Sequence, residues 1–252
     1  MSAAQPQTRP APQTRPAPPA APADGSALTR PRRKERQPAL SRAQIVAAAV
    51  RLLDAEGIEE LSMRKLGTGM GAAATSLYRH VAGKDELIEL VLDEVYGELE
   101  VPGAASAAEW RDAVSRGGHG LRAMALRHPW VASVIGRVGP ARLGPNLTRV
   151  SDRMLALFRT GGFPADEAEL AMRAVISYVV GATTGEAAHL SLLARSGQSE
   201  QEWLEGMRPA ARRSVAEHSA SVGRDPKKLR EENFDYGLQR VLDGLETRLS
   251  RG

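Results

Sequence analysis

Seven polar side chains gather in the stretch 61–87, and their types suit contact with a nucleic acid. They are Arg64, Thr75, Ser76, Tyr78, Arg79, His80 and Lys84. An arginine can donate two parallel hydrogen bonds to a guanine, and threonine or serine can bond a base edge or touch a thymine methyl group. Tyrosine and lysine suit phosphate oxygens, whose contacts fix register without reading sequence. Thr75, Ser76, Tyr78, Arg79 and His80 lie close together in this stretch and are therefore candidates for a DNA-contacting surface.

Two of the seven have a structural alternative. Tyr78 could pack against the preceding helix, and His80 could bond the free carbonyl groups at a helix C-terminus. The sequence leaves both alternatives open.

The elements that position these side chains are three short predicted helices. Ser41 and Gln44 have the spacing of a capping box at the start of the first helix, which Gly57 ends. Ser62 opens the second helix, with Leu61 and Leu66 spaced as a hydrophobic staple. Gly71 forms a turn, and the third helix carries residues 75–80. Two short helices joined by a glycine turn are the layout that places the second helix in a DNA major groove.

Two local features weaken this unit. Gly67 and Gly69 each cost the second helix about 1 kcal/mol relative to alanine. The third helix lacks a capping side chain, because alanines stand at 72–74 where serine, threonine or aspartate is preferred.

The rest of the chain is predicted to be helical. Apolar positions with helical period indicate helices over 85–101, 110–128, 142–160, 165–193 and 231–248, a short apolar turn or helix over 130–135, and one short helix around 201–218. The breakers between them include Pro102-Gly103, Gly161-Gly162-Phe163-Pro164 and Asp225-Pro226. The helix 165–193 is apolar over more than one stripe, so it must be covered on more than one side. No alternating strand pattern is sustained, and the predicted fold class is all-α.

Residues 1–38 form a separate segment. They hold nine of the sixteen prolines, and QTRPAP occurs twice in succession. We predict a disordered arm with polyproline character. The run 30–36 has five basic residues and one acidic residue, a net charge of +4 that suits phosphate contact or serves as a solvated linker.

Composition excludes several classes of protein. The chain has no cysteine, which removes disulfides and thiolate metal sites. No apolar run approaches the roughly 20 residues of a membrane span, and no signal peptide stands at the N-terminus. We expect a soluble, cytoplasmic protein.

With those residues in place, the N-terminal part resembles the TetR family of bacterial transcriptional repressors. The likeness rests on three short helices in order, Leu61-Ser62-Met63-Arg64-Lys65-Leu66, and Leu77-Tyr78-Arg79-His80-Val81 followed by Gly83-Lys84-Asp85-Glu86-Leu87. It covers about residues 41–90. The remainder resembles the tetracycline-repressor type of regulatory domain, through Leu157-Phe158, the Gly161–Pro164 turn and the long helix after it.

The resemblance implies a function and a domain organisation. Such proteins are homodimers that bind palindromic double-stranded operators and release them when a small molecule enters the C-terminal domain. The expected domains are 1–38, 39–86 (helix-turn-helix) and 87–252 (larger helical domain for ligand binding and dimerisation). Residues 165–193 and 231–249 of two subunits would form a four-helix interface. The resemblance also implies that Arg64 touches phosphate or base and that Lys84 binds phosphate, beside a recognition surface of Thr75, Ser76, Tyr78, Arg79 and His80. Ala73 and Ala74 depart from the family pattern, so fewer side chains would read bases.

The resemblance also implies a mostly apolar effector pocket. Its candidate residues are Trp110, Leu121, Trp130, Ile135, Met154, Phe158 and Tyr178; each is also a plausible core residue. Residues 134–147 contain no histidine, so we predict neither magnesium nor tetracycline, and no cofactor or metal. We interpret the remaining histidines as surface residues or as residues whose hydrogen bonds are satisfied within the protein, and not as ligand-binding groups: His119, His128, His189 and His218.

Two other classes of function compete with this hypothesis. An enzyme would need a recognisable motif, and the sequence has no Gly-x-Ser-x-Gly, His-Glu-x-x-His, Walker loop or Gly-x-Gly-x-x-Gly after a strand. An interaction module whose helix-turn-helix no longer binds DNA would explain the glycines of the second helix and the uncapped third. We expect a ligand-responsive repressor that is not an enzyme.

Overall fold

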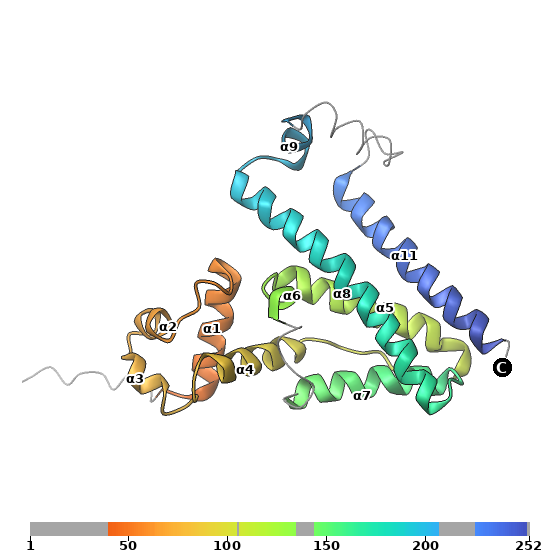
Figure 1. Ribbon diagram of the computed structural model, residues 1–252, viewed down its shortest axis with the longest axis horizontal. Coiled ribbons are helices and arrows are strands. Elements are labelled where there is room, and N and C mark those ends of the chain that lie inside the picture. The colour runs from red at the N-terminus through yellow and green to blue at the C-terminus, as the bar shows by residue number, and fades with distance from the viewer. Residues whose placement is uncertain (1–39, 105, 135–143, 207–224, 251–252) are drawn as a thin grey trace, which may run out of the picture. The chain divides into compact units, whose positions relative to one another are not determined.

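The computed structural model describes residues 40–104, 106–134, 144–206 and 225–250. Within these ranges the chain has helices and no β-strand, which confirms the all-α prediction (Figure 1). The helices are α1 (Arg42–Glu56), α2 (Met63–Gly69), α3 (Ala74–Leu77), α4 (Lys84–Tyr96), the 3₁₀ turn η1 (Ala107–Glu109), α5 (Trp110–Arg127), α6 (Val131–Val134), α7 (Pro145–Thr160), α8 (Ala165–Ser196), α9 (Glu200–Gly206) and α11 (Pro226–Leu249). No described helix is both long and apolar enough to cross a membrane. The predicted arm, 1–38, lies outside the described residues.

The starts of the first two helices are as predicted. The Ser41 hydroxyl accepts from the Gln44 nitrogen at 3.2 Å, and the Gln44 side chain accepts from the Ser41 nitrogen at 3.0 Å. Gly57 ends α1 with φ +83°. The Ser62 hydroxyl caps α2 by accepting from the Lys65 nitrogen at 3.1 Å. These local signals fix α1 and α2 because each satisfies amide groups that a helix end leaves free.

The third helix is shorter than predicted. Ala73 gives no side-chain cap, and α3 spans only four residues. Tyr78, Arg79 and His80 lie in the turn that follows, where the His80 nitrogen bonds the Leu77 carbonyl at 2.9 Å. The prediction that they are helical is wrong, because this bond between residues three apart tightens the chain and ends the α-helix early.

Helix α4 also ends earlier than predicted, at Tyr96 instead of near residue 101. Gly97 ends it and lies against the start of α7. A Cβ atom added at Gly97 would lie 3.1 Å from Nδ2 of Asn146. Leu99 and Val101 are buried without being helical, which explains why the apolar pattern continued past the helix end.

Four helices form the C-terminal core. Helix α8 packs against α5, α7 and α11 (Figure 1). A Cβ atom at Gly118 of α5 would lie 3.2 Å from the Leu238 side chain and 3.4 Å from the Val179 side chain. The glycine that weakens α5 by propensity therefore lets it approach both α8 and α11 closely.

Several boundaries in this part differ from the predictions. Helix α11 begins at Pro226 instead of Glu231, because Asp225 caps it by accepting from the Lys227 nitrogen at 3.0 Å. An Asp-Pro pair interpreted as a breaker is thus a helix start. Helix α8 continues to Ser196, and α7 is described from Pro145. Helix α9 begins at Glu200, but most of the predicted helix 201–218 lies outside the described residues, as does Ile135.

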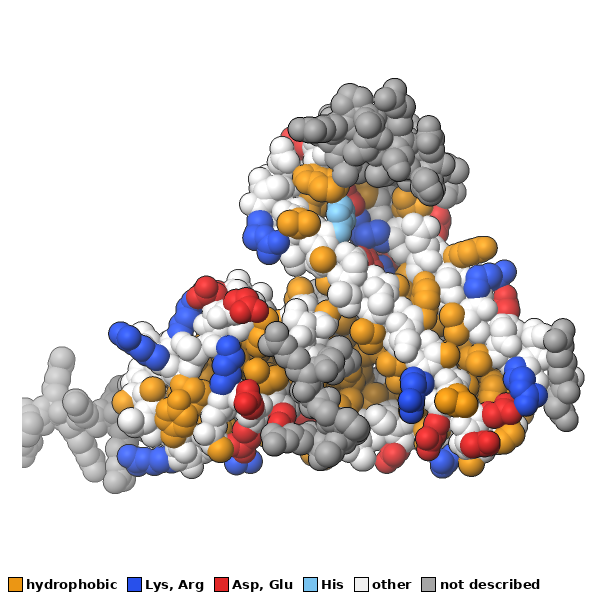
Figure 2. Space-filling model, viewed as in Figure 1, with side chains coloured by type: hydrophobic (Ala, Val, Ile, Leu, Met, Phe, Trp, Pro, Cys, Tyr) orange, Lys and Arg blue, Asp and Glu red, His pale blue; other side chains and the backbone are white. Residues whose placement is uncertain are grey.

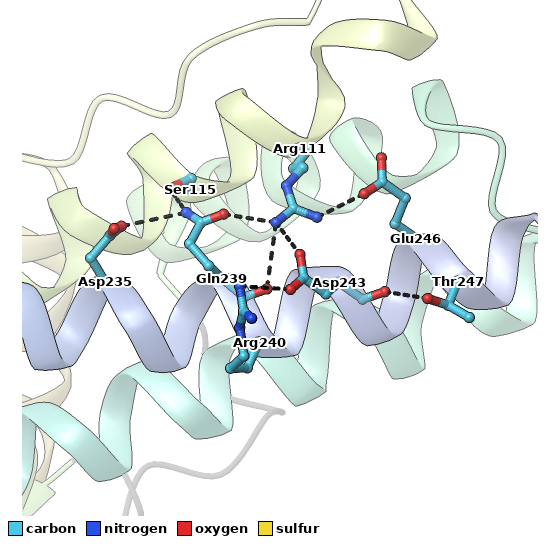
Figure 3. Close-up of polar contacts among 8 residues, drawn as sticks. All are labelled: Arg111, Ser115, Asp235, Gln239, Arg240, Asp243, Glu246 and Thr247. Atoms are coloured by element: carbon cyan, nitrogen blue, oxygen red, sulfur yellow. Dashed lines mark hydrogen bonds and ion pairs between the residues drawn. The ribbon is translucent and has the colours of Figure 1, made fainter.

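A polar cluster fixes α11 to α5 (Figure 3). The Arg111 guanidinium lies 2.5 Å from the Asp243 carboxylate and 2.8 Å from the Glu246 carboxylate, and donates to the Gln239 side chain at 2.8 Å. Gln239 in turn donates to the Ser115 hydroxyl at 3.2 Å. One arginine of α5 therefore holds two turns of α11 in a defined register.

Candidate nucleic-acid interface and internal cavity

The crossing of α2 and α3 depends on Gly67. A Cβ atom there would lie 2.8 Å from the Ala72 carbonyl oxygen and 3.2 Å from the Ala74 nitrogen. Gly71 makes the turn between the helices with φ +65°. Gly67 lowers helix propensity, but only glycine lets the backbone of α3 approach α2 this closely. It therefore supports the helix-turn-helix instead of arguing against it.

Three cations around this unit are exposed and unpaired. The side chains of Arg64, Arg79 and Lys84 make no hydrogen bond or ion pair with any part of the chain that the structure describes. Lys65, in contrast, is paired with Glu56 and with Glu60, the latter at 2.7 Å. These bonds raise the pKa of Lys65 and lower the pKa of Glu60. The neighbouring lysine is thus held within the protein, while the predicted contact residues remain free for a partner.

The uncharged candidates are distributed between surface and interior. Thr75 is exposed, and Tyr78 is 52% exposed. Ser76 and His80 are half-buried. Exposure of more than half of the Tyr78 side chain favours contact with a partner over packing against α1.

Hydrogen bonds made by Arg42 and Glu86, which no sequence pattern indicated, hold the turn that carries Tyr78, Arg79 and His80. Nε of Arg42 donates to the His80 carbonyl at 3.0 Å, and the same guanidinium bonds Glu86 at 3.3 Å. The other oxygen of Glu86 accepts from the Ala82 nitrogen. Side chains of α1 and α4 therefore fix the C-terminal end of this turn.

The C-terminal part encloses a cavity of about 270 Å³ between α4, α5, α7 and α8. Its lining is mostly aliphatic, and the polar side chains in it are Tyr96, Glu100 and Ser151. Burial raises the pKa of Tyr96 to about 12. A recess of about 10 Å³ adjoins it behind Leu121 and Val179, and contains the buried Thr183 hydroxyl, which bonds to no described residue. The volume is near the lower end of the range of about 300–1,000 Å³ for small-molecule sites.

Two of the seven predicted effector residues, Leu121 and Met154, line this cavity. Ile135 lies outside the described residues. Among the others, Trp110 and Phe158 pack together with a centroid distance of 5.9 Å. Trp130 donates its indole hydrogen to Asp54 at 2.8 Å. The Tyr178 hydroxyl donates to the Phe234 carbonyl at 2.8 Å. These four have core or helix-joining contacts away from the cavity lining.

Sequence reasoning missed lining residues in α4, α5, α7 and α8 and in the segment after α4. Leu92 and Tyr96 of α4 and Val175 of α8 line the cavity, together with Glu100. In the sequence these apolar positions look like any other core position. The one available signal was Gly117-Gly118, because small residues in a core helix leave space beside them.

Two polar contacts fix the helices around the cavity, and the second of them reaches α1 of the DNA-contacting part. Oδ1 of Asp93, in α4, accepts from the Asn146 and Leu147 nitrogens at 2.9 Å each and so caps α7. His128, at the end of α5, contacts Asp54 of α1 at 2.7 Å and Glu98 at 3.1 Å. Both contacts connect elements far apart in sequence.

No group of metal-binding side chains gathers in the described ranges. His119, His128 and His189 each contact a carboxylate, at 3.2, 2.7 and 2.9 Å. His218 lies outside those ranges.

An exposed helix-turn-helix surface and a separate enclosed cavity define the class of a ligand-responsive DNA-binding regulator. Residues 45–91 match the model of bacterial regulatory proteins of the tetR family, and residues 102–249 match the tetracyclin repressor-like C-terminal domain. The chain belongs to the TetR family, as its sequence motifs implied.

Comparisons with individual relatives agree with this family assignment. The chain is 34% identical over 214 residues to the HTH-type transcriptional repressor DrrR1 of Streptomyces coeruleorubidus, covering 83% of this chain and 78% of that protein. It resembles the structure of ActR from Streptomyces coelicolor in complex with actinorhodin, with 27% identity, TM-score 0.65, and coverage of 83% of this chain and 96% of ActR. It also resembles BioQ with its double-stranded DNA operator, with 27% identity, TM-score 0.53, and coverage of 62% and 97%.

Proposed function

We propose that the chain is a homodimeric repressor that binds a palindromic operator through α3 and the turn after it. Arg79 and Thr75 read base edges, with Ser76 and His80 at the margin of the surface. Tyr78, Arg64 and Lys84 bond phosphates. The observation that carries the proposal is the set of exposed cations beside α3 that pair with no residue in the described ranges. A module that had stopped binding DNA would have no need to leave them without partners.

The test is retardation of the DNA upstream of the protein's own gene, and of duplexes selected from a random pool, across a salt series. Arg79→Ala should weaken specific binding by roughly tenfold to a hundredfold, because a two-pronged contact to guanine is lost. Lys84→Ala should reduce the slope of log affinity against log salt by about 0.9, which corresponds to one phosphate. Lys228→Ala, an exposed cation of α11, is the matched control. Absence of any specific duplex would contradict the proposal.

A variant lacking residues 1–37 in the same series tests whether the basic run 30–36 adds phosphate contacts.

The dimer is proposed to use the outer face of α8. Leu170 is 62% exposed and Leu192 is 53% exposed, and at 100° per residue they lie on one face of the helix. Small side chains stand between them: Ala174, Ser177, Gly181, Gly185 and Ala188 are exposed. Figure 2 shows hydrophobic side chains at the surface along α8 and α11. A smooth, partly apolar face allows two helices to approach closely.

Gly181→Arg should therefore shift the dimer to monomer in sedimentation and weaken operator binding. A Cβ atom at Gly181 meets nothing within 4 Å, so the subunit should still fold. Ala194→Arg, exposed on another face of α8, should leave the dimer intact. An unchanged dimer in the Gly181 variant would show that another surface forms the interface. Val241 and Leu245, also predicted interface residues, are half-buried against the subunit's own core.

The effector is proposed to bind in the cavity between α4, α5, α7 and α8, with residues 39–86 as the DNA-binding domain and 87–252 as the regulatory domain. The cavity lies against α4, whose first turn carries Lys84. A ligand can release DNA only to the extent that it binds the DNA-bound conformation and the released conformation with different affinities.

We also propose that the protein has no enzymatic activity, in keeping with its family of regulators, and acts in the cytoplasm with the chromosome.

A further inference from the structure

We propose that the cavity accepts an uncharged, mainly apolar molecule and excludes anions, and that the Tyr96 hydroxyl binds the ligand's single hydrogen-bond acceptor. This inference rests on the effector site proposed above and names its ligand class.

Among the described residues, the cavity lining offers no positive charge with which to hold an anion. None of its lining residues in the described part of the chain is lysine, arginine or histidine. An ionised ligand would lose its hydration without gaining a counter-charge, which is costly in an aliphatic environment. Arg149 donates to the carbonyl oxygen of the lining residue Leu99 at 3.4 Å, but its own side chain is not part of the lining.

One lining residue carries a negative charge. Glu100 is exposed and makes no hydrogen bond or ion pair within the described ranges. A free carboxylate at the solvent-exposed part of the lining repels an approaching anion. It does not penalise a neutral ligand, because the carboxylate remains hydrated.

Tyr96 supplies the polar contact. Its side chain is 5% exposed, and its hydroxyl bonds to no described residue. Burial raises the pKa of Tyr96 to about 12, so the group is a neutral donor at physiological pH. A hydroxyl that donates to no described residue is available to donate to an acceptor atom of a ligand. A carbonyl or ether oxygen on an otherwise apolar molecule fits this description.

The position of Tyr96 links the ligand to DNA binding. Tyr96 and Leu92 belong to α4, which begins at Lys84 beside the proposed DNA surface. A bond at Tyr96 therefore acts on the helix that supports the turn containing Arg79.

Two dyes with the same ring skeleton test the charge preference. N-phenylnaphthylamine is neutral, and anilinonaphthalene sulfonate adds one sulfonate. Fluorescence titration of the full-length protein should give saturable binding of the neutral dye, roughly tenfold or more tighter than the sulfonate. Equal affinity, or preference for the sulfonate, would overturn the proposal. Glu100→Arg should improve sulfonate binding, whereas Glu94→Arg, on an exposed position of α4, should not.

The ketone dye Prodan tests the assigned hydrogen bond, because its emission shifts to the red when its carbonyl accepts one. Tyr96→Phe should move the emission of bound Prodan to the blue and weaken its binding by roughly threefold to tenfold. The same variant should leave N-phenylnaphthylamine binding unchanged, since that dye lacks a carbonyl. A uniform loss of both dyes, or no change for Prodan, would show that Tyr96 is not the ligand's partner.

The site itself is tested by Leu121→Trp, which fills the cavity and should abolish binding of both neutral dyes. Ala194→Trp, at an exposed position of α8, is the control. Neutral dyes that bind the Leu121 variant as well as wild type would overturn the location. Operator retardation is measured on the same preparations without dye, so a failed dye experiment is separable from failure of the DNA-binding proposal.

Discussion

The DNA-contacting surface and the internal cavity are built in opposite ways. Around α3, charged side chains project from a small rigid core and lack partners within the described protein. In the cavity, the property that matters is the space left beside glycines and short side chains of packed helices. The first site is defined by exposed charged groups that no described residue pairs with. The second is defined by empty space between packed helices. Glycine is needed in both sites, but the atoms around it differ in how far they can move when a side chain is added at the glycine.

The largest effect is expected at Gly67. In Gly67→Val the new side chain would meet the backbone of Ala72 and Ala74, which cannot move without separating α3 from α2. We expect a loss of about 1–3 kcal/mol in stability and loss of specific operator binding. Calorimetry and DNA retardation measure both quantities.

Gly69 provides the matched control in the same helix. A Cβ atom there meets nothing within 4 Å, so Gly69→Val should retain the fold and specific binding. Equal damage from both variants would mean that helix propensity, and not the close approach of α3, explains the need for glycine.

An intermediate effect is expected at Asp93 of α4, the helix that begins beside the DNA-contacting surface and lines the cavity. Asp93→Ala removes the cap of α7 and should cost about 0.5–2 kcal/mol of stability, while Asp93→Asn keeps an acceptor oxygen and should cost less. Chemical denaturation of the two variants gives the difference. If the alanine variant is as stable as wild type, the contact between α4 and α7 contributes no stability.

The smallest effect is expected at Gly117 of the cavity lining. A Cβ atom there would lie 2.8 Å from Sδ of Met154, which is the flexible end of a side chain next to open space. Gly117→Ala should change stability by less than about 1 kcal/mol, because the gain in helix propensity offsets the shift of Met154. Neutral-dye affinity should fall as the cavity narrows. A large loss of stability would contradict the comparison with Gly67.

The sequence alone was sufficient for most of the DNA-contacting unit. Ser41, Ser62 and Gly57 act on residues three or four positions away, so their effect on helix ends is readable from the chain. The seven contact candidates lie within 21 residues, from 64 to 84, and a local motif fixes their relation to one another. The hydrogen bond from Arg42 to His80 was not predictable, since it spans 38 residues.

The position of the cavity and the residues that line it depend on the tertiary structure. Its lining comes from residues 92 to 179, and each apolar position has the same periodicity whether it faces a cavity or a packed core. Trp110 and Phe158 were predicted as pocket residues by analogy with the family, yet their large side chains fill space instead of leaving it. Helix ends that depend on distant contacts, such as that of α4 at Gly97 beside Asn146, were also missed. Local hydrogen bonding determined the helices and the DNA-contacting motif, and only the packing of α4, α5, α7 and α8 against one another determined where the protein is hollow.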